Sequence, residues 1–152
     1  MKNLIEKLIN TDDDIGLLFA RLTLGFVMFP HGAQKLFGLF GGNGFSGTFN
    51  YFTSSGMPAL IAILVILGES LGSIALIAGF FGRFMAFGIG IIMLGAIFMV
   101  HLQNGFFMNW FGKQAGEGFE YHLLAIGLAV IIMLKGSGAF SIDRYINKSR
   151  IQ

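Results

Sequence analysis

Seven ionisable residues stand inside or at the ends of long apolar stretches of this 152-residue chain. Charge in a hydrocarbon environment is costly, so such residues usually face the interior of a helical assembly and either pair with one another or line a pathway. Histidine titrates near neutral pH and can exchange protons with a ligand. The residues are Arg21, His31, Lys35, Glu69, His101, Glu120 and His122.

The first apolar stretch carries a face that we expect to point inward. Its members recur at spacings of three and four, which places them on one side of a helix. They are Arg21, Gly25, Met28, Gly32 and Lys35. At 1.5 Å per residue, Arg21 lies roughly 10 Å and Glu69 roughly 16–18 Å from the same end of their helices. An arginine side chain spans this difference, so the sequence predicts a buried Arg21–Glu69 ion pair, either functional or a device that fixes helix register.

A second group lies toward the opposite ends of the helices and contains all three histidines of the chain. Such a group can ligate a metal or haem, can bind and protonate a quinone-like carbonyl, or can consist of polar helix ends at a membrane interface. Neither HxxxH nor HExxH spacing occurs, so we assign no metal and favour a quinone over haem. The members of the group are His31, Lys35, His101, Glu120 and His122.

Composition identifies the elements that must position these residues. Hydrophobic residues make up 55% of the chain and charged residues 12%, which at this length is typical of a single transmembrane domain over residues 1–152. Four apolar stretches approach the roughly 20 residues that a spanning helix needs. We therefore expect an all-α, integral membrane four-helix bundle with spans over residues 15–37, 57–81, 84–102 and 119–135.

Residue counts exclude several kinds of chemistry. The chain has no cysteine, which excludes a thiolate nucleophile and a cysteine-ligated iron–sulfur cluster. Redox chemistry would therefore use a bound organic or histidine-ligated cofactor. The ten lysines and arginines are scattered along the chain, so we expect the lipid bilayer and not nucleic acid as a partner.

The segments around the spans have patterns of their own. Apolar residues at helical spacing in residues 1–10 and 142–146 predict short helices that lie in the membrane interface. The outer loops over residues 38–56 and 102–118 are rich in glycine and aromatic residues. These aromatics form either an interfacial belt or a lid over a cavity between the helices.

Glycines within the spans predict close helix contacts. Gly68 and Gly72 form a small-xxx-small pair that permits close approach of a neighbouring helix. The neighbour can belong to the same bundle or to a second copy of the chain, so a homo-oligomer is one outcome of this pattern.

Lysines and arginines outside the spans predict the orientation. With four spans, both termini and the connection between the second and third spans lie on one side of the membrane. By the positive-inside rule that side is the cytoplasm. It holds seven basic residues, Lys2, Lys7, Arg83, Lys135, Arg144, Lys148 and Arg150, against Lys35 and Lys113 on the other side.

Short motifs follow one another from about residue 15 to residue 146. They are Arg21 with Gly25, His31-Gly32-Ala33-Gln34-Lys35-Leu36, Glu69-Ser70-Leu71-Gly72, Gly82-Arg83, His101, Glu120-Tyr121-His122 and Gly138-Ala139-Phe140-Ser141-Ile142-Asp143. Their order resembles the DoxX family of small bacterial inner-membrane proteins. This resemblance covers nearly the whole chain.

The resemblance implies a four-helix membrane bundle that is an oxidoreductase, or the membrane subunit of a redox complex, acting on or near quinones or catechols. Relatives are associated with thiosulfate:quinone oxidation, with resistance to quinones and catechols, and with oxidative-stress complexes. The outer aromatic loops would hold the ring, the histidines and Glu120 would exchange protons with it, and a soluble oxidoreductase would be the partner. The alternative is a membrane binding, transport or assembly module without chemistry.

Overall fold

The computed structural model describes residues 4–149, and over these residues the chain is helical with no β-strand. In chain order the elements are α1 (Leu4–Ile9), α2 (Ile15–Phe37), the 3-10 turn η1 (Leu39–Gly41), α3 (Gly44–Ser54), α4 (Ala59–Ala78), α5 (Gly82–Ala96), the π-helical turn η2 (Ile97–His101), the 3-10 turn η3 (Leu102–Asn104), α6 (Glu120–Lys135) and α7 (Ile142–Ser149). The all-α prediction is confirmed.

Within the described residues, three helical segments are long and apolar enough to cross a membrane. They are Ile15–Phe37, Ala59–Ala78 and Gly82–Asn104. The helix at the predicted fourth span, α6, has 16 residues. At 1.5 Å per residue it is about 24 Å long, short of the roughly 30 Å hydrocarbon core, so a fourth span stays a prediction.

Local signals explain where the long helices begin and end. The Asp14 carboxylate accepts a hydrogen bond from the Leu17 backbone N–H at 3.1 Å and so caps the start of α2. Gly38 and Gly79, both in the left-handed conformation, end α2 and α4. These caps fix the ends of the two helices that carry the polar face and Glu69.

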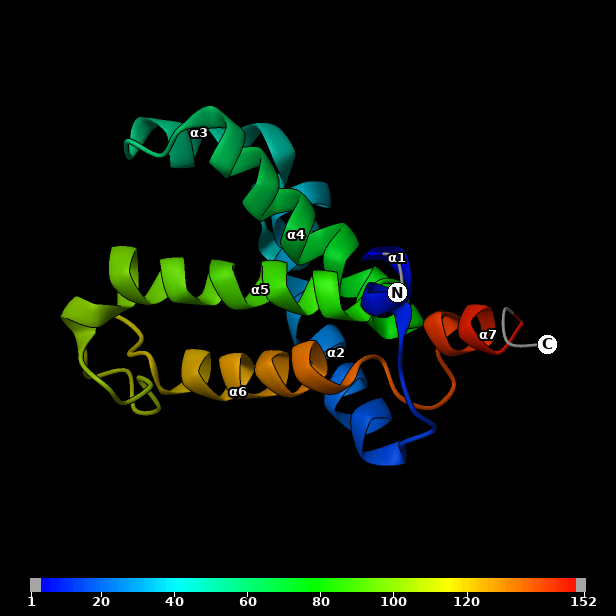
Figure 1. Ribbon diagram of the computed structural model, residues 1–152. Helices are drawn as coiled ribbons and strands as arrows, with labels where there is room; N and C mark the ends of the chain where they lie inside the picture. The colour runs from blue at the N-terminus through cyan, green and yellow to red at the C-terminus, as the bar shows by residue number, and fades with distance from the viewer. Residues whose placement is uncertain (1–3, 150–152) are drawn as a thin grey trace.

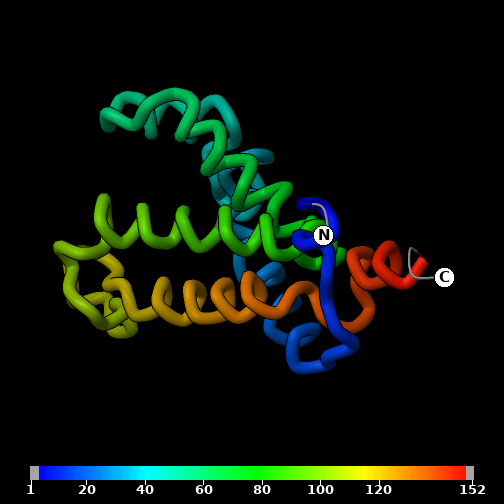
Figure 2. Tube along the Cα trace, in the orientation of Figure 1, coloured from blue at the N-terminus to red at the C-terminus, as the bar shows by residue number. Residues whose placement is uncertain are grey.

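The four longest helices pack in two pairs, α2 with α4 and α5 with α6, and the pairs contact each other through α4 with α5 and α2 with α6. Figure 1 shows the pairs converging near α1 and α7, while α3 and the adjoining part of α4 diverge from α5. The trace in Figure 2 shows α5 and α6 side by side over their lengths. The apolar core consists of Leu24, Met28, Leu76, Ala86, Ile89, Met93, Ala125, Ala129 and Ile132.

Glycines of α2 make the closest approach between the helices. A Cβ atom added to Gly32 would lie 2.3 Å from the Glu69 backbone oxygen, so only glycine fits there. The predicted glycine pair in α4, Gly68 and Gly72, does not bring the backbone of a neighbouring helix this close. A Cβ on Gly68 would meet only the end of the Ile92 side chain, and one on Gly72 would lie 3.9 Å from Met85 Sδ. The close-packing glycines therefore lie on the partner helix.

The first of the predicted outer loops is largely a helix. Residues 44–54 form α3, although they contain three glycine and asparagine residues that favour turns. Phe45 and Phe49, one helical turn apart, stack with ring centroids 5.9 Å apart. Aromatic residues at helical spacing thus outweigh the turn signals in this segment. The part of the second loop that follows Asn104 contains turns, and both the belt and the lid interpretations stay predictions.

The two ends of the described chain are helical, as predicted. α1 lies within residues 1–10, and α7 extends the predicted 142–146 helix to Ser149. Their position in a membrane interface stays a prediction. Lys2 and Arg150, which entered the charge asymmetry, lie outside the described residues.

Candidate functional site

Arg21 binds backbone carbonyl groups, and not Glu69 as the sequence predicts. Its side chain is 1% exposed. Nε donates to Ser137 O at 2.8 Å, Nη2 donates to the carbonyls of residues 139 and 140 at 3.1 and 3.2 Å, and Nη1 donates to Leu76 O at 3.0 Å and also to Ile77 O. The guanidinium thus joins the end of α4 to the segment before α7.

Asp143 holds the same end of the molecule together from the other side. Its buried carboxylate accepts hydrogen bonds from the backbone N–H groups of Phe81 and Gly82 at 2.8 and 2.9 Å and from Ser137 Oγ at 2.5 Å. The carboxylate therefore sits at the start of α5, where the helix dipole favours negative charge. Arg83 adds bonds to Met133 O at 2.5 Å and Leu134 O at 2.8 Å at the end of α6. We call Arg21, Arg83, Ser137 and Asp143 the polar knot.

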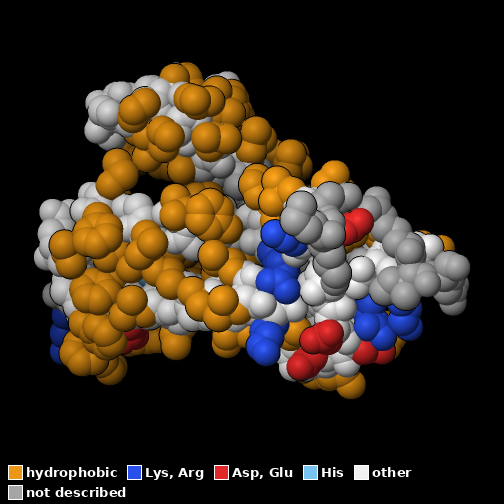
Figure 3. All heavy atoms as spheres, in the orientation of Figure 1, with side chains coloured by type: hydrophobic (Ala, Val, Ile, Leu, Met, Phe, Trp, Pro, Cys, Tyr) orange, Lys and Arg blue, Asp and Glu red, His pale blue; other side chains and the backbone are white. Residues whose placement is uncertain are grey.

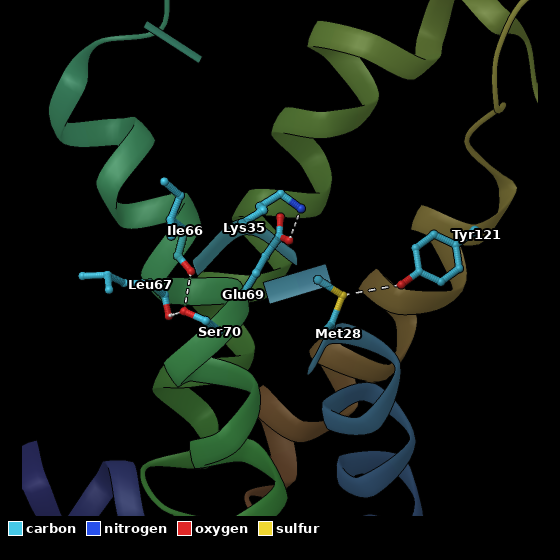
Figure 4. Close-up of polar contacts among 7 residues, drawn as sticks. All are labelled: Met28, Lys35, Ile66, Leu67, Glu69, Ser70 and Tyr121. Atoms are coloured by element: carbon cyan, nitrogen blue, oxygen red, sulfur yellow. Dashed lines mark hydrogen bonds and ion pairs between the residues drawn. The ribbon is translucent and has the colours of Figure 1, made fainter. Parts of the chain in front are cut away.

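Glu69 pairs with Lys35, which the sequence places in the other group. Lys35 Nζ lies 2.5 Å from Glu69 Oε2, and the two side chains are 24% and 6% exposed. Figure 4 shows both side chains between α4 and α6, with Tyr121 pointing toward the same space from α6. A buried acid is thus neutralised by a base that keeps some access to the surroundings.

Four aromatic rings continue the polar group from this ion pair. The ring centroids of His31 and Tyr121 are 6.3 Å apart, those of Tyr121 and His122 5.3 Å, and those of His122 and His101 4.1 Å. His31 also interacts electrostatically with Lys35 and Glu69. We call these six residues the polar cluster: His31, Lys35, Glu69, His101, Tyr121 and His122.

Hydrogen bonding shows which ring nitrogen of His101 carries a proton, and it leaves one ring nitrogen of His122 without a partner among the described residues. His101 Nδ1 lies 2.8 Å from the Glu117 backbone oxygen. A carbonyl can only accept, so this nitrogen carries a proton, and Nε2 of the neutral ring is then the basic atom. His122 is 6% exposed, and its Nδ1 is a buried polar atom without a hydrogen-bond partner within the described chain. An orphaned buried nitrogen of this kind calls for a partner that the protein does not supply.

Two site residues depart from the sequence prediction. Glu120 accepts a hydrogen bond from Trp110 Nε1 at 3.1 Å, in the 102–118 connection, and makes no ring or ion-pair contact with the polar cluster. Tyr121 was missed, because a tyrosine beside two ionisable residues gives no spacing signal of its own. Its OH contacts Met28 Sδ at 3.5 Å. The first turn of α6 therefore contributes Tyr121 and His122 to the polar cluster.

The donor groups of the polar cluster are nitrogen and oxygen atoms of histidine, lysine, tyrosine and glutamate. Among residues 4–149, no three or more His, Asp or Glu side chains are grouped so that they could hold a metal ion. The imidazole, phenol, ammonium and carboxylate groups of the polar cluster can form hydrogen bonds and transfer protons.

We expect the free energies of unfolding to show that Glu69 is coupled to Lys35 and not to Arg21. Lys35→Met and Glu69→Gln should each destabilise the protein, and the double variant should cost less than the sum, because each single change leaves a charge without its partner. Arg21→Met combined with Glu69→Gln serves as the control and should be additive. Thermal unfolding in detergent measures both cycles, and coupling in the Arg21 cycle alone would contradict the assignment.

Known proteins are similar in sequence to most of this chain. The family model described as DoxX matches residues 16–102. The protein named "Putative oxidoreductase CatD" of Bacillus subtilis (strain 168) is 27% identical over 93% of this chain and 94% of its own length. Inner membrane protein YqjF of Escherichia coli (strain K12) is 31% identical over 90% of this chain and 95% of its own length. Inner membrane protein YphA of the same organism is 29% identical over 84% of this chain and 88% of its own length. No solved structure matches the chain significantly.

The helical fold with three apolar segments and these matches define a small helical membrane protein. The chain belongs to the DoxX family. The matched range contains the ion pair Lys35–Glu69, together with His31 and His101, whereas the first turn of α6 lies beyond it.

Proposed function

We propose that the protein binds a quinone- or catechol-like ring at the polar cluster and serves as the membrane part of an oxidoreductase. The observation that carries the proposal is the unpartnered Nδ1 of His122, buried next to His101 and Tyr121. A flat ring with oxygen substituents supplies hydrogen-bonding groups for such a nitrogen and π-faces for the neighbouring rings. The Bacillus subtilis relative is named "Putative oxidoreductase CatD", and this name supports the same class of function.

The cluster offers two proton acceptors and a hydrogen-bond donor on different helices. Oxidation of a hydroquinone releases two protons and two electrons. Nε2 of His101 would accept one proton from a ring hydroxyl, since its Nδ1 is held by the Glu117 carbonyl, and the unpartnered Nδ1 of His122 would accept the other. Lys35 can donate a hydrogen bond to a ring oxygen while Glu69 balances its charge. The electrons pass to a separate redox partner, for which we propose a soluble oxidoreductase.

We propose the four-helix, multi-pass topology of the sequence analysis, with α6 as the fourth span and both termini in the cytoplasm of an inner membrane. The start of α5, the end of α6 and α7 gather near α1 (Figure 1), and Figure 3 shows basic side chains at this end of the molecule. These segments contain Arg83, Lys135 and Arg144, which suits the positive-inside rule. The polar cluster would then lie in the outer half of the membrane. The Escherichia coli relatives are named inner membrane proteins, which supports this location.

Trp110, the single tryptophan of the chain, gives a direct test of ring binding. Its indole is hydrogen-bonded to Glu120, the residue before Tyr121, so a quinone at the polar cluster should quench its fluorescence. We expect saturable quenching by a tail-free benzoquinone, weakened about tenfold by His122→Phe, which corresponds to about 1.4 kcal/mol. Tyr145→Phe on α7 is the matched control and should bind as the parent does. Unsaturable quenching in every variant would reject the site.

A further inference from the structure

α4 and α5 contact each other near Ala78 and Gly82, which we call their inner ends. They separate toward Ala59 and Ala96, their outer ends (Figure 1). A Cβ on Gly72 would lie 3.9 Å from Met85 Sδ, and one on Gly68 would lie 2.6 Å from Ile92 Cδ1. These contacts identify the stripe of each helix that faces the other. Gly68 is directly beside Glu69 in the chain, so the contacts reach the level of the polar cluster.

Outward from the level of Gly68, the facing stripes of α4 and α5 continue along each helix but no longer contact each other (Figure 1). On α4, one helical turn and two turns outward from Gly68, lie Leu64 and Ile61, which are 53% and 46% exposed. On α5 and η2 the stripe continues through Gly95, where an added Cβ would meet nothing within 4 Å, and Met99, which is 60% exposed. Both walls of the resulting opening are therefore apolar.

The opening is visible on the surface of the molecule. Figure 3 shows it hollowed between the lobe of α3 and α4 and the body of α5 and α6, with hydrophobic side chains on both sides. The stretch of α4 from Glu69 to Ala59 is about 15 Å long at 1.5 Å per residue. We call this opening the α4–α5 cleft.

We propose that the ligand of the polar cluster carries a long hydrocarbon tail, and that it enters from the bilayer through the α4–α5 cleft, where its tail remains. The inference rests on the proposed function. A ring alone would fill only the inner, polar end and would leave about 15 Å of apolar wall to the acyl chains of the bilayer, which a tail joined to the ring can replace. An isoprenoid tail attached to the ring matches both parts, because its head finds hydrogen bonds and its tail finds apolar walls. The ligand class is therefore a membrane quinone and not a water-soluble catechol.

The test compares one benzoquinone ring without a tail, with a decyl tail and with a longer isoprenoid tail. The full chain is placed in lipid nanodiscs, and Trp110 quenching is plotted against the mole fraction of each quinone in the bilayer, so that partitioning into lipid does not count as affinity. We expect the tailed rings to bind at least about tenfold more tightly than the tail-free ring, about 1.4 kcal/mol.

Two matched glycine variants connect the effect to the cleft. Gly95→Phe should reduce the affinity for the tailed rings to that of the tail-free ring, because the new side chain fills the α5 wall. Gly127→Phe places the same side chain on α6, where an added Cβ also meets nothing within 4 Å, opposite the buried Ala125 and Ala129. This control should leave all three affinities unchanged.

Equal affinities of tailed and tail-free rings in the parent chain would overturn the tail proposal and leave ring binding standing. The same conclusion would follow if Gly95→Phe weakened every ring equally, or if an alkyl phosphocholine displaced the tailed quinone as well as the quinone itself did. A chain that binds none of the rings would instead reject the proposed function, so the two failures are distinguishable.

Discussion

Arg21→Met should destabilise the protein by about 3–5 kcal/mol, the range for loss of one partner from a buried charged network. Arg21 is 1% exposed and donates to five backbone carbonyl groups of α4 and of residues 137–140. Methionine fills much of the volume but leaves those oxygens short of donors and leaves the charge of Asp143 less balanced. The thermal unfolding midpoint in detergent measures the loss.

Arg21→Lys tests whether charge or geometry is responsible. An ammonium group keeps the charge but cannot reproduce the five-donor fork, so we expect it to recover less than half of the loss. Arg144→Met is the matched control, because Arg144 pairs with the 60% exposed Asp13 and such surface pairs contribute about 0–1 kcal/mol. A loss at Arg144 as large as at Arg21 would contradict the role of the polar knot.

Gly32→Ala should cost about 3 kcal/mol through overpacking of α2 against α4. The added methyl group would lie 2.3 Å from the Glu69 oxygen and 2.4 Å from Ser70 Cα, and these are backbone atoms that cannot rotate away. α4 must therefore move, and Glu69 moves away from Lys35 with it. We expect a lower unfolding midpoint together with weaker quenching of Trp110 by a tail-free quinone.

Gly127→Ala provides the comparison, because the methyl group there enters open space on α6. Its helix propensity should make it neutral or stabilising by up to about 1 kcal/mol. If Gly32→Ala were tolerated equally well, α2 and α4 would not approach as closely as described here.

The sequence predicts the inward face of the first helix because burial leaves a periodic pattern. Arg21, Gly25, Met28 and Gly32 are all buried, as their spacing indicates. The pattern does not predict the partners of the charged residues on that face. Carbonyl oxygens belong to every residue and leave no mark in the sequence, so the acceptors of Arg21 could not be found from residue types.

Counting residues from the ends of the helices does not predict the partner in an ion pair either. It places Glu69 within reach of Arg21, yet the contact is with Lys35, about 21 Å further along α2 at 1.5 Å per residue. The packing of α2 on α4 sets Gly25 beside Ser73 and Gly32 beside Glu69, so Arg21 meets the carbonyls at the end of α4 and Glu69 comes within reach of Lys35. The resemblance to the DoxX family includes Asp143 in its closing motif, but only the structure shows that its carboxylate caps α5.

The central claim is that a quinone-like ring occupies the polar cluster, and photolabelling tests it most directly. An azido-quinone is bound to the full chain in nanodiscs, irradiated, and its attachment sites are mapped by mass spectrometry with and without excess unlabelled quinone. We predict competed labels on α2 near His31 and on the first turn of α6 near Tyr121 and His122. Labels confined to lipid-facing residues elsewhere, unchanged by the competitor, would contradict the account.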